Sequence, residues 1–167
     1  MSHESTLWPR DKKELYDLLA KQAAALTDGC PLPLPALSNA AALLWEALPD
    51  INWAGFYLAK GETLYLGPFQ GKTACTVIPF GRGVCGTAAA TREIQLVEDV
   101  HQFPGHIACD SASNSEIVLP LVVDGLLAGV LDIDSPSLSR FDQADAEGLA
   151  GIRDVLTGQV DWSHGLL

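Results

Sequence analysis

Positive charge is scarce in this 167-residue sequence, which has 10 Lys and Arg against 21 Asp and Glu and a formal net charge of -11. No cluster of basic side chains offsets that charge locally. Such a surface repels phosphate backbones, so we expect no nucleic-acid partner. A zwitterionic ligand is not excluded, because carboxylates attract its ammonium group.

Long apolar runs are also lacking. The longest one, residues 117–123, is far too short to span a bilayer and contains Pro120. Residues 1–13 are polar and charged, without the apolar core of an export signal. We therefore expect no membrane partner and a cytoplasmic location, where a reducing environment keeps most thiols out of permanent disulfides.

The sequence has four cysteines but no CxxC pair. Cys75, Cys85 and Cys109 lie far apart in the chain, each near a loop or the end of an expected element, where functional residues concentrate. The alternative is that they are small buried apolar side chains without chemistry. We interpret Cys30, which precedes a proline-rich stretch, as such a filler or as a surface bystander.

Apolar side chains recur at helical spacing over residues 11–27, which predicts a first helix. The proline-rich residues 30–35 end this pattern. Ser38 is the predicted N-cap of a second helix that ends at Pro49, and Asp142 is the predicted N-cap of a last helix over residues 143–157.

The middle of the chain is rich in short strands and turns. The expected strands are residues 53–58, 63–66, 75–78, 94–97, 116–123 and 126–133. Turns are expected at residues 60–62 and 124–125, and a glycine loop at residues 81–86 opens a short helix. The polar residues 101–114 are interpreted as a long loop that folds over a site.

These elements predict an α+β fold, a central antiparallel sheet flanked by N- and C-terminal helices. We expect one domain over residues 1–167. Its parts are an N-terminal helix and proline-rich loop (1–35), a core (36–157) and a tail (158–167).

Two cysteines have neighbours that could activate a thiol. Cys85 starts the predicted short helix, whose amide dipoles would stabilise a thiolate, so local reasoning favours it as the most acidic thiol. Cys109 lies in the long loop near His106, a candidate proton partner. An alternative is a zinc site made of His101, His106, Cys109 and another cysteine, although the usual paired spacing is missing.

Asp132 and Asp134 share one face of a strand because side chains alternate. With a two-residue turn at 124–125, Glu116 faces Ile133 and therefore points to the opposite face. The three acids converge only if a bulge or a frayed end intervenes. Converging acids need a compensating cation, either a substrate ammonium or a divalent metal; otherwise they are separate solvated residues.

Trp53 and Tyr57 also share one strand face, with Phe56 on the other. The pair could wall an apolar pocket of methyl size or simply pack in the core.

Six runs of the sequence are specific in combination. They are residues 50–58 (DINWAGFYL), 66–72 (LGPFQGK), 81–87 (GRGVCGT), 105–110 (GHIACD), 113–120 (SNSEIVLP) and 129–134 (GVLDID). Together they resemble the free methionine-R-sulfoxide reductases, over about residues 40–150. The resemblance implies a GAF fold, a homodimer, and reduction of the free amino acid sulfoxide in its R form. It further implies thioredoxin as electron donor, with no bound cofactor and no metal.

The same resemblance assigns roles to residues. Cys109 takes the place of the nucleophile, Cys75 of the usual resolving cysteine and Cys85 of the third cysteine, and Cys30 lies outside the pattern. The implied substrate-binding residues are Trp53, Tyr57, Glu116, Asp132 and Asp134.

The implied cycle is attack by Cys109 on the sulfoxide sulfur, a sulfenic acid on Cys109, and a disulfide with Cys75 or with Cys85 as relay. The assignment of Cys109 disagrees with the local argument for Cys85, and we follow the resemblance. The rival hypothesis is a non-catalytic GAF module that senses a small ligand or redox state.

Overall fold

The structure is a computed structural model and describes residues 8–107, 109 and 112–166. Its helices are α1 (Lys12–Thr27), α2 (Pro33–Ala47), α3 (Gly83–Thr91) and α4 (Gln143–Gln159), with a 3₁₀ turn η1 (Val100–Gln102). Its strands are β1 (Trp53–Lys60), β2 (Thr63–Gly71), β3 (Val77–Pro79), β4 (Gln95–Val97), β5 (Ser115–Val123) and β6 (Leu126–Ser135).

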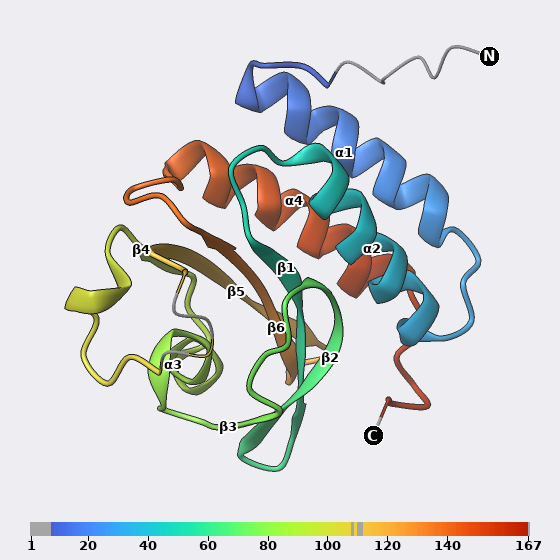
Figure 1. Cartoon of the computed structure of the whole chain (residues 1–167). Helices are drawn as coiled ribbons and strands as arrows, with labels where there is room; N and C mark the ends of the chain where they lie inside the picture. Colours follow the sequence, from blue (N-terminus) through green and yellow to red (C-terminus); the bar gives the residue numbers. More distant parts are fainter. Residues whose placement is uncertain (1–7, 108, 110–111, 167) are drawn as a thin grey trace.

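The strands form one antiparallel sheet in the order β3-β2-β1-β6-β5-β4. Helices α1, α2 and α4 cover one face, and the short α3 lies on the other (Figure 1). The predicted α+β fold with terminal helices against an antiparallel sheet is confirmed.

Side-chain alternation along the strands divides the interior into two clusters. On β1, Phe56 and Leu58 point toward α1, α2 and α4, and they belong to the larger cluster. Trp53 and Tyr57 point the other way, into a smaller cluster that includes α3. The sheet therefore has one face committed to core packing and another that faces α3.

A buried carboxylate joins the two terminal helices. Asp145, in the first turn of α4, accepts hydrogen bonds from the Tyr16 hydroxyl and the Lys12 ammonium of α1, each at 2.7 Å. Arg140 donates to the same carboxylate at 3.4 Å. A buried charge of this kind is tolerated because all its partners are polar or cationic.

The helix caps are only partly those expected. Asp11 caps α1 and Asp142 caps α4, the latter as predicted. The predicted cap at Ser38 is wrong, because α2 already begins at Pro33. Proline suits a first helical position, since that amide needs no partner inside the helix. The Ser38 hydroxyl instead donates to the Leu34 carbonyl within the helix.

The turn between β5 and β6 decides the site geometry. Asp124 and Gly125 have φ of 51° and 77°, as the predicted tight hairpin requires. Val122 still pairs with Leu127, but Leu121 pairs with Gly129. This bulge adds one residue to β6, so Glu116 pairs with Asp134, and the simple count that paired it with Ile133 is wrong.

The start of the third strand also differs from the prediction. β3 begins at Val77, so Cys75 precedes it in a loop, where the sequence predicted a strand from residue 75.

Within the described residues, no helix combines the length and the apolar character needed to cross a membrane.

Candidate active site

The bulge brings three carboxyl groups to one face of the sheet. Glu116 pairs with Asp134, and Asp134 pairs with Trp53 on the other side, so these three residues form one row across β5, β6 and β1. Asp132 lies two residues from Asp134 on the same face. All three acids are buried, with exposed fractions of 7% for Glu116, 5% for Asp132 and 8% for Asp134.

Burial changes the acidity of these carboxyl groups. Removal from water, and then the charges of Asp132 and Asp134, raise the pKa of Glu116 well above its usual value. Burial also raises the pKa of Asp132, to about 6, although hydrogen bonds with Glu116, Cys85 and Asp134 oppose the rise. Of the two, Glu116 therefore keeps its proton more readily, beside an Asp132 that ionises more readily.

Asp132 carries an unusual oxygen. Among the described side chains, its Oδ1 is the buried polar atom that lacks a hydrogen-bond partner. An unpaired buried acceptor costs free energy unless a ligand supplies the missing donor or charge. Because Asp132 lines the cavity described below, this oxygen can accept a hydrogen bond from a ligand or from water.

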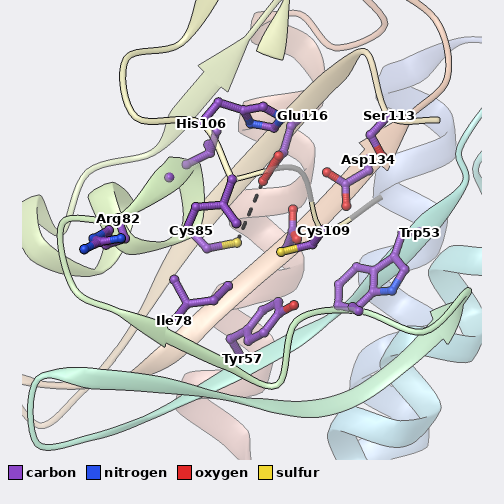
Figure 2. Close-up of a pocket in the computed structure, with 15 residues that line it drawn as sticks. Trp53, Tyr57, Ile78, Arg82, Cys85, His106, Cys109, Ser113, Glu116 and Asp134 are labelled. Atoms are coloured by element: carbon purple, nitrogen blue, oxygen red, sulfur yellow. Dashed lines mark hydrogen bonds between the residues drawn. The ribbon is translucent and has the colours of Figure 1, made fainter. Parts of the chain in front are cut away.

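Cys85 joins the carboxyl cluster from the first turn of α3. Its thiol donates to Oε1 of Glu116 at 3.8 Å and is 5% exposed (Figure 2). Burial, and then the charges of Asp132 and Glu116, raise its pKa well above the usual value. The expectation that Cys85 is the most acidic thiol is wrong, because desolvation and carboxylate repulsion outweigh the helix dipole.

Cys75 and Cys109 form a disulfide, with Cα atoms 5.4 Å apart. Cys75 lies between β2 and β3, and Cys109 lies in the loop before β5. Both are half-buried, whereas Cys85 and Cys30 are free thiols. The structure thus joins the two cysteines that the resemblance named as resolving residue and nucleophile, and it leaves Cys85 outside the pair.

Trp53 and Tyr57 contact the loop that carries Cys75. The Trp53 and Tyr57 rings stack with centroids 5.8 Å apart. Trp53 Nε1 donates to the Lys72 carbonyl at 3.1 Å, and the Tyr57 hydroxyl donates to the Cys75 carbonyl at 3.0 Å. The pair therefore holds the loop that carries Cys75, a duty that strand periodicity alone does not reveal.

These groups line one cavity of about 520 Å³, including its opening to solvent. Its walls include Trp53, Tyr57, Cys85, Cys109 and the three acids. Figure 2 labels all of these residues except Asp132. Other lining residues, to which sequence reasoning assigned no role, are Ala74, Ile78, Arg82, Val84, Ile107 and Ser113. Apolar walls with a few convergent polar groups are typical of a site for a small ligand.

The expected long loop does reach the site. His106, Ile107, Cys109 and Ser113 all line the cavity, and the Asn52 amide donates to the Ser113 hydroxyl at 3.1 Å. Residues 108 and 110, which belong to the GHIACD run, and residue 111 lie outside the described residues. The quoted motifs were the one sequence signal that pointed to Asn52 and Ser113.

His106 is available as a neutral base or donor. Partial burial and the nearby His101 lower its pKa, and the two rings lie 6.1 Å apart. The zinc site considered from His101, His106 and Cys109 is not assembled, since Cys109 is bonded to Cys75. In the described part of the chain, the potential metal ligands that cluster are instead Cys85, Glu116 and Asp132.

Cys30 lies outside the site. It is half-buried, and its thiol donates to the Leu32 carbonyl at 3.2 Å ahead of α2. This position fits the bystander interpretation.

Comparisons with known proteins agree with this geometry. The GAF domain family model matches residues 13–156. The free methionine-R-sulfoxide reductase of Escherichia coli is 59% identical over 139 residues, which cover 83% of this chain and 84% of that protein. The enzyme of that name from Saccharomyces cerevisiae is 49% identical, covering 87% of this chain and 86% of that protein.

Solved structures extend the likeness to three dimensions. The free methionine-R-sulfoxide reductase of Neisseria meningitidis, solved in complex with its substrate, has a TM-score of 0.79 and 43% identity, covering 95% of this chain and 91% of that one. Fold, sequence and family model agree, so the chain belongs to the GAF domain family and, within it, to the free methionine-R-sulfoxide reductases.

Proposed function

We propose that this chain reduces free L-methionine (R)-S-oxide to L-methionine with its own thiols. The observation that carries the proposal is the Cys75–Cys109 pair at a cavity that also holds three buried carboxyl groups. The relatives from E. coli and S. cerevisiae named for this reaction support it.

The cavity offers a matching surface to three groups of the substrate, which are the S-methyl group, the sulfoxide oxygen and the ammonium. The stacked Trp53 and Tyr57 rings provide an apolar surface for the S-methyl group. The carboxyl groups that line the cavity are partners for two polar groups of the substrate, the sulfoxide oxygen and the ammonium. A methionine sulfoxide inside a polypeptide has no ammonium group, which accounts for a preference for the free amino acid.

In the first step, the Cys109 sulfur attacks the sulfoxide sulfur as a thiolate. The S–O bond breaks, the oxygen ends on Cys109 as sulfenic acid, and methionine leaves. The departing oxygen needs a proton, and Glu116 is suited to supply it because burial and its acidic neighbours raise its pKa well above the usual value. We therefore assign Glu116 as the general acid and Asp132 as its anionic neighbour.

In the second step, the Cys75 thiol attacks the Cys109 sulfenic acid, and water leaves as the disulfide forms. The protein has then lost two electrons and the substrate has gained them. Cys75 rather than Cys85 takes this role, since Cys85 is buried against Glu116.

The remaining parts of the cycle are proposals about partners. A thioredoxin-like dithiol resets the enzyme, because the half-buried disulfide lies where another thiol can reach it. The thiols store the electrons, so no bound cofactor or metal is required. We further propose a homodimer in the cytoplasm, and light scattering after gel filtration tests the dimer.

A coupled assay tests the proposed function. Purified protein, thioredoxin, thioredoxin reductase and NADPH are mixed with either epimer of free methionine sulfoxide. We expect NADPH consumption with the R form alone, no turnover for Cys109→Ser, and unchanged turnover for Cys30→Ser as the matched control. Ligand binding without turnover by the unmodified protein would favour the sensory module instead.

A further inference from the structure

Three different donor side chains converge in the cavity. The Cys85 sulfur and one oxygen each of Glu116 and Asp132 all lie within 4.8 Å of one another. They come from three elements, α3, β5 and β6, and each residue is at most 7% exposed. The sheet and the first turn of α3 therefore hold them in place without a local sequence motif.

A second observation shows that the cluster is incomplete by itself. The Oδ1 atom of Asp132 is buried without a hydrogen-bond partner, and Asp132 lines the cavity. The proposed mechanism uses Glu116 as an acid and needs no contribution from the Cys85 sulfur. The Cys85 sulfur therefore has no role in that mechanism, although it lies within 4.8 Å of carboxylate oxygens of both Glu116 and Asp132.

We propose that Cys85, Glu116 and Asp132 form a binding site for a divalent transition-metal ion of the zinc class, and that this ion blocks substrate binding. Sulfur and carboxylate oxygen are both zinc ligands. Three protein ligands leave a fourth position toward the cavity, as in open zinc sites. A thiolate disfavours Mg²⁺ and Ca²⁺, which take oxygen ligands.

Charge also favours such an ion. The three ligands repel one another when ionised, and a divalent cation offsets most of their summed charge. Binding displaces the protons of the Cys85 thiol and of Glu116 into solution, with no change of oxidation state. Glu116 and Asp132 then coordinate the ion, and these are residues that contact the substrate in the proposed function.

The site does not depend on the redox pair. Cys75 and Cys109 are bonded to each other here, while Cys85 remains a thiol. The ion should therefore bind the disulfide form of the protein, in which the other free thiol is Cys30. Zinc capture by reduced Cys75 and Cys109, a separate event, is excluded in that form.

The experiment is a Co²⁺ titration of the disulfide form, followed by the thiolate-to-cobalt absorption band, with Zn²⁺ added afterwards to displace the cobalt. We expect one Co²⁺ per chain, loss of the band in Cys85→Ser, and an unchanged band in Cys30→Ser. Asp132→Asn should weaken affinity about tenfold or more. Circular dichroism checks that each variant is folded.

An unchanged band in folded Cys85→Ser, or no saturable band in the unmodified protein, would overturn the site. Because the disulfide form reduces no substrate, either outcome leaves the proposed function untouched. The blocking effect is tested on reduced protein by methionine release in one turnover. The Zn²⁺ concentration that halves release should rise about tenfold in Cys85→Ser, relative to its own uninhibited rate, and not in Cys30→Ser; an equal concentration in both would refute blocking at this site.

Discussion

Cys85 and Cys109 line the same cavity, yet their surroundings give them different chemistry. Cys85 is buried, its thiol donates a hydrogen bond to Glu116, and its raised pKa keeps the thiol protonated. Cys109 lies on a half-buried loop within bonding distance of Cys75. Sequence reasoning identified both residues but misjudged the acidity of Cys85, because a helix start is visible in the sequence and the carboxylates that come from β5 and β6 are not.

The Tyr57 hydroxyl gives a residue-scale test of the second step. Tyr57→Phe keeps the ring but removes the hydrogen bond to the Cys75 carbonyl. Loss of one such bond, about 1 kcal/mol, should slow disulfide formation about fivefold while methionine release keeps its rate. Rapid mixing with free methionine sulfoxide, followed by thiol counting and methionine analysis, separates the two steps. Equal slowing of both steps would contradict this role.

The buried Asp132 makes stability depend on pH. Its pKa is raised from 3.8 to about 6, so the folded state binds more protons than the unfolded chain between these values. The protonated Asp132 therefore contributes to the free energy of unfolding. This contribution is fully present below about pH 4 and is lost as pH rises through 6.

Asp132→Asn removes this titration. Relative to the unmodified protein, the variant should gain up to about 3 kcal/mol of unfolding free energy between pH 4 and pH 7. Urea unfolding of both proteins, each with the disulfide formed, measures the difference. A difference that does not change with pH would show that Asp132 ionises normally in the folded protein.

At the scale of elements, the β5–β6 bulge matters most. The sequence predicted the Asp124–Gly125 turn and both strands, and it indicated that the acids converge only with a bulge or a frayed strand end. It could not locate one, because the extra residue of β6 carries no local signature and is selected by pairing with β1 and β5 together. The early start of α2 was not predicted either. Proline can end one helix or begin the next, and the local sequence does not distinguish the two.

Contact between α1 and α4 provides a matched pair of variants on one helix. A Cβ atom at Gly148 would overlap the Tyr16 ring, which Asp145 holds in place. Gly151 has no atom within 4 Å of that position. Gly148→Ala should destabilise the protein by about 1–3 kcal/mol, and Gly151→Ala should stabilise it by about 0.5–1 kcal/mol. Chemical unfolding checks both, and equal effects would refute the packing argument.

On the scale of the whole molecule, the sheet separates stability from chemistry. Three helices cover one face of the sheet, and α3 lies on the other (Figure 1). The larger apolar cluster packs beneath the three helices, whereas the smaller cluster and the cavity lie on the α3 side. The order of elements made the first face predictable. The site residues of the second face were identified through the family resemblance. They come from distant loops and strands that only tertiary pairing brings together.

The most direct measurement of the central claim is a single turnover without any reductant. Reduced protein is mixed with excess free methionine (R)-S-oxide, methionine is counted, and the cysteines are mapped by mass spectrometry after alkylation in denaturant. The account predicts about one methionine per chain, a Cys75–Cys109 disulfide, and alkylated Cys85 and Cys30. Release of no methionine, or a disulfide that contains Cys85 in place of Cys75 or Cys109, would contradict it.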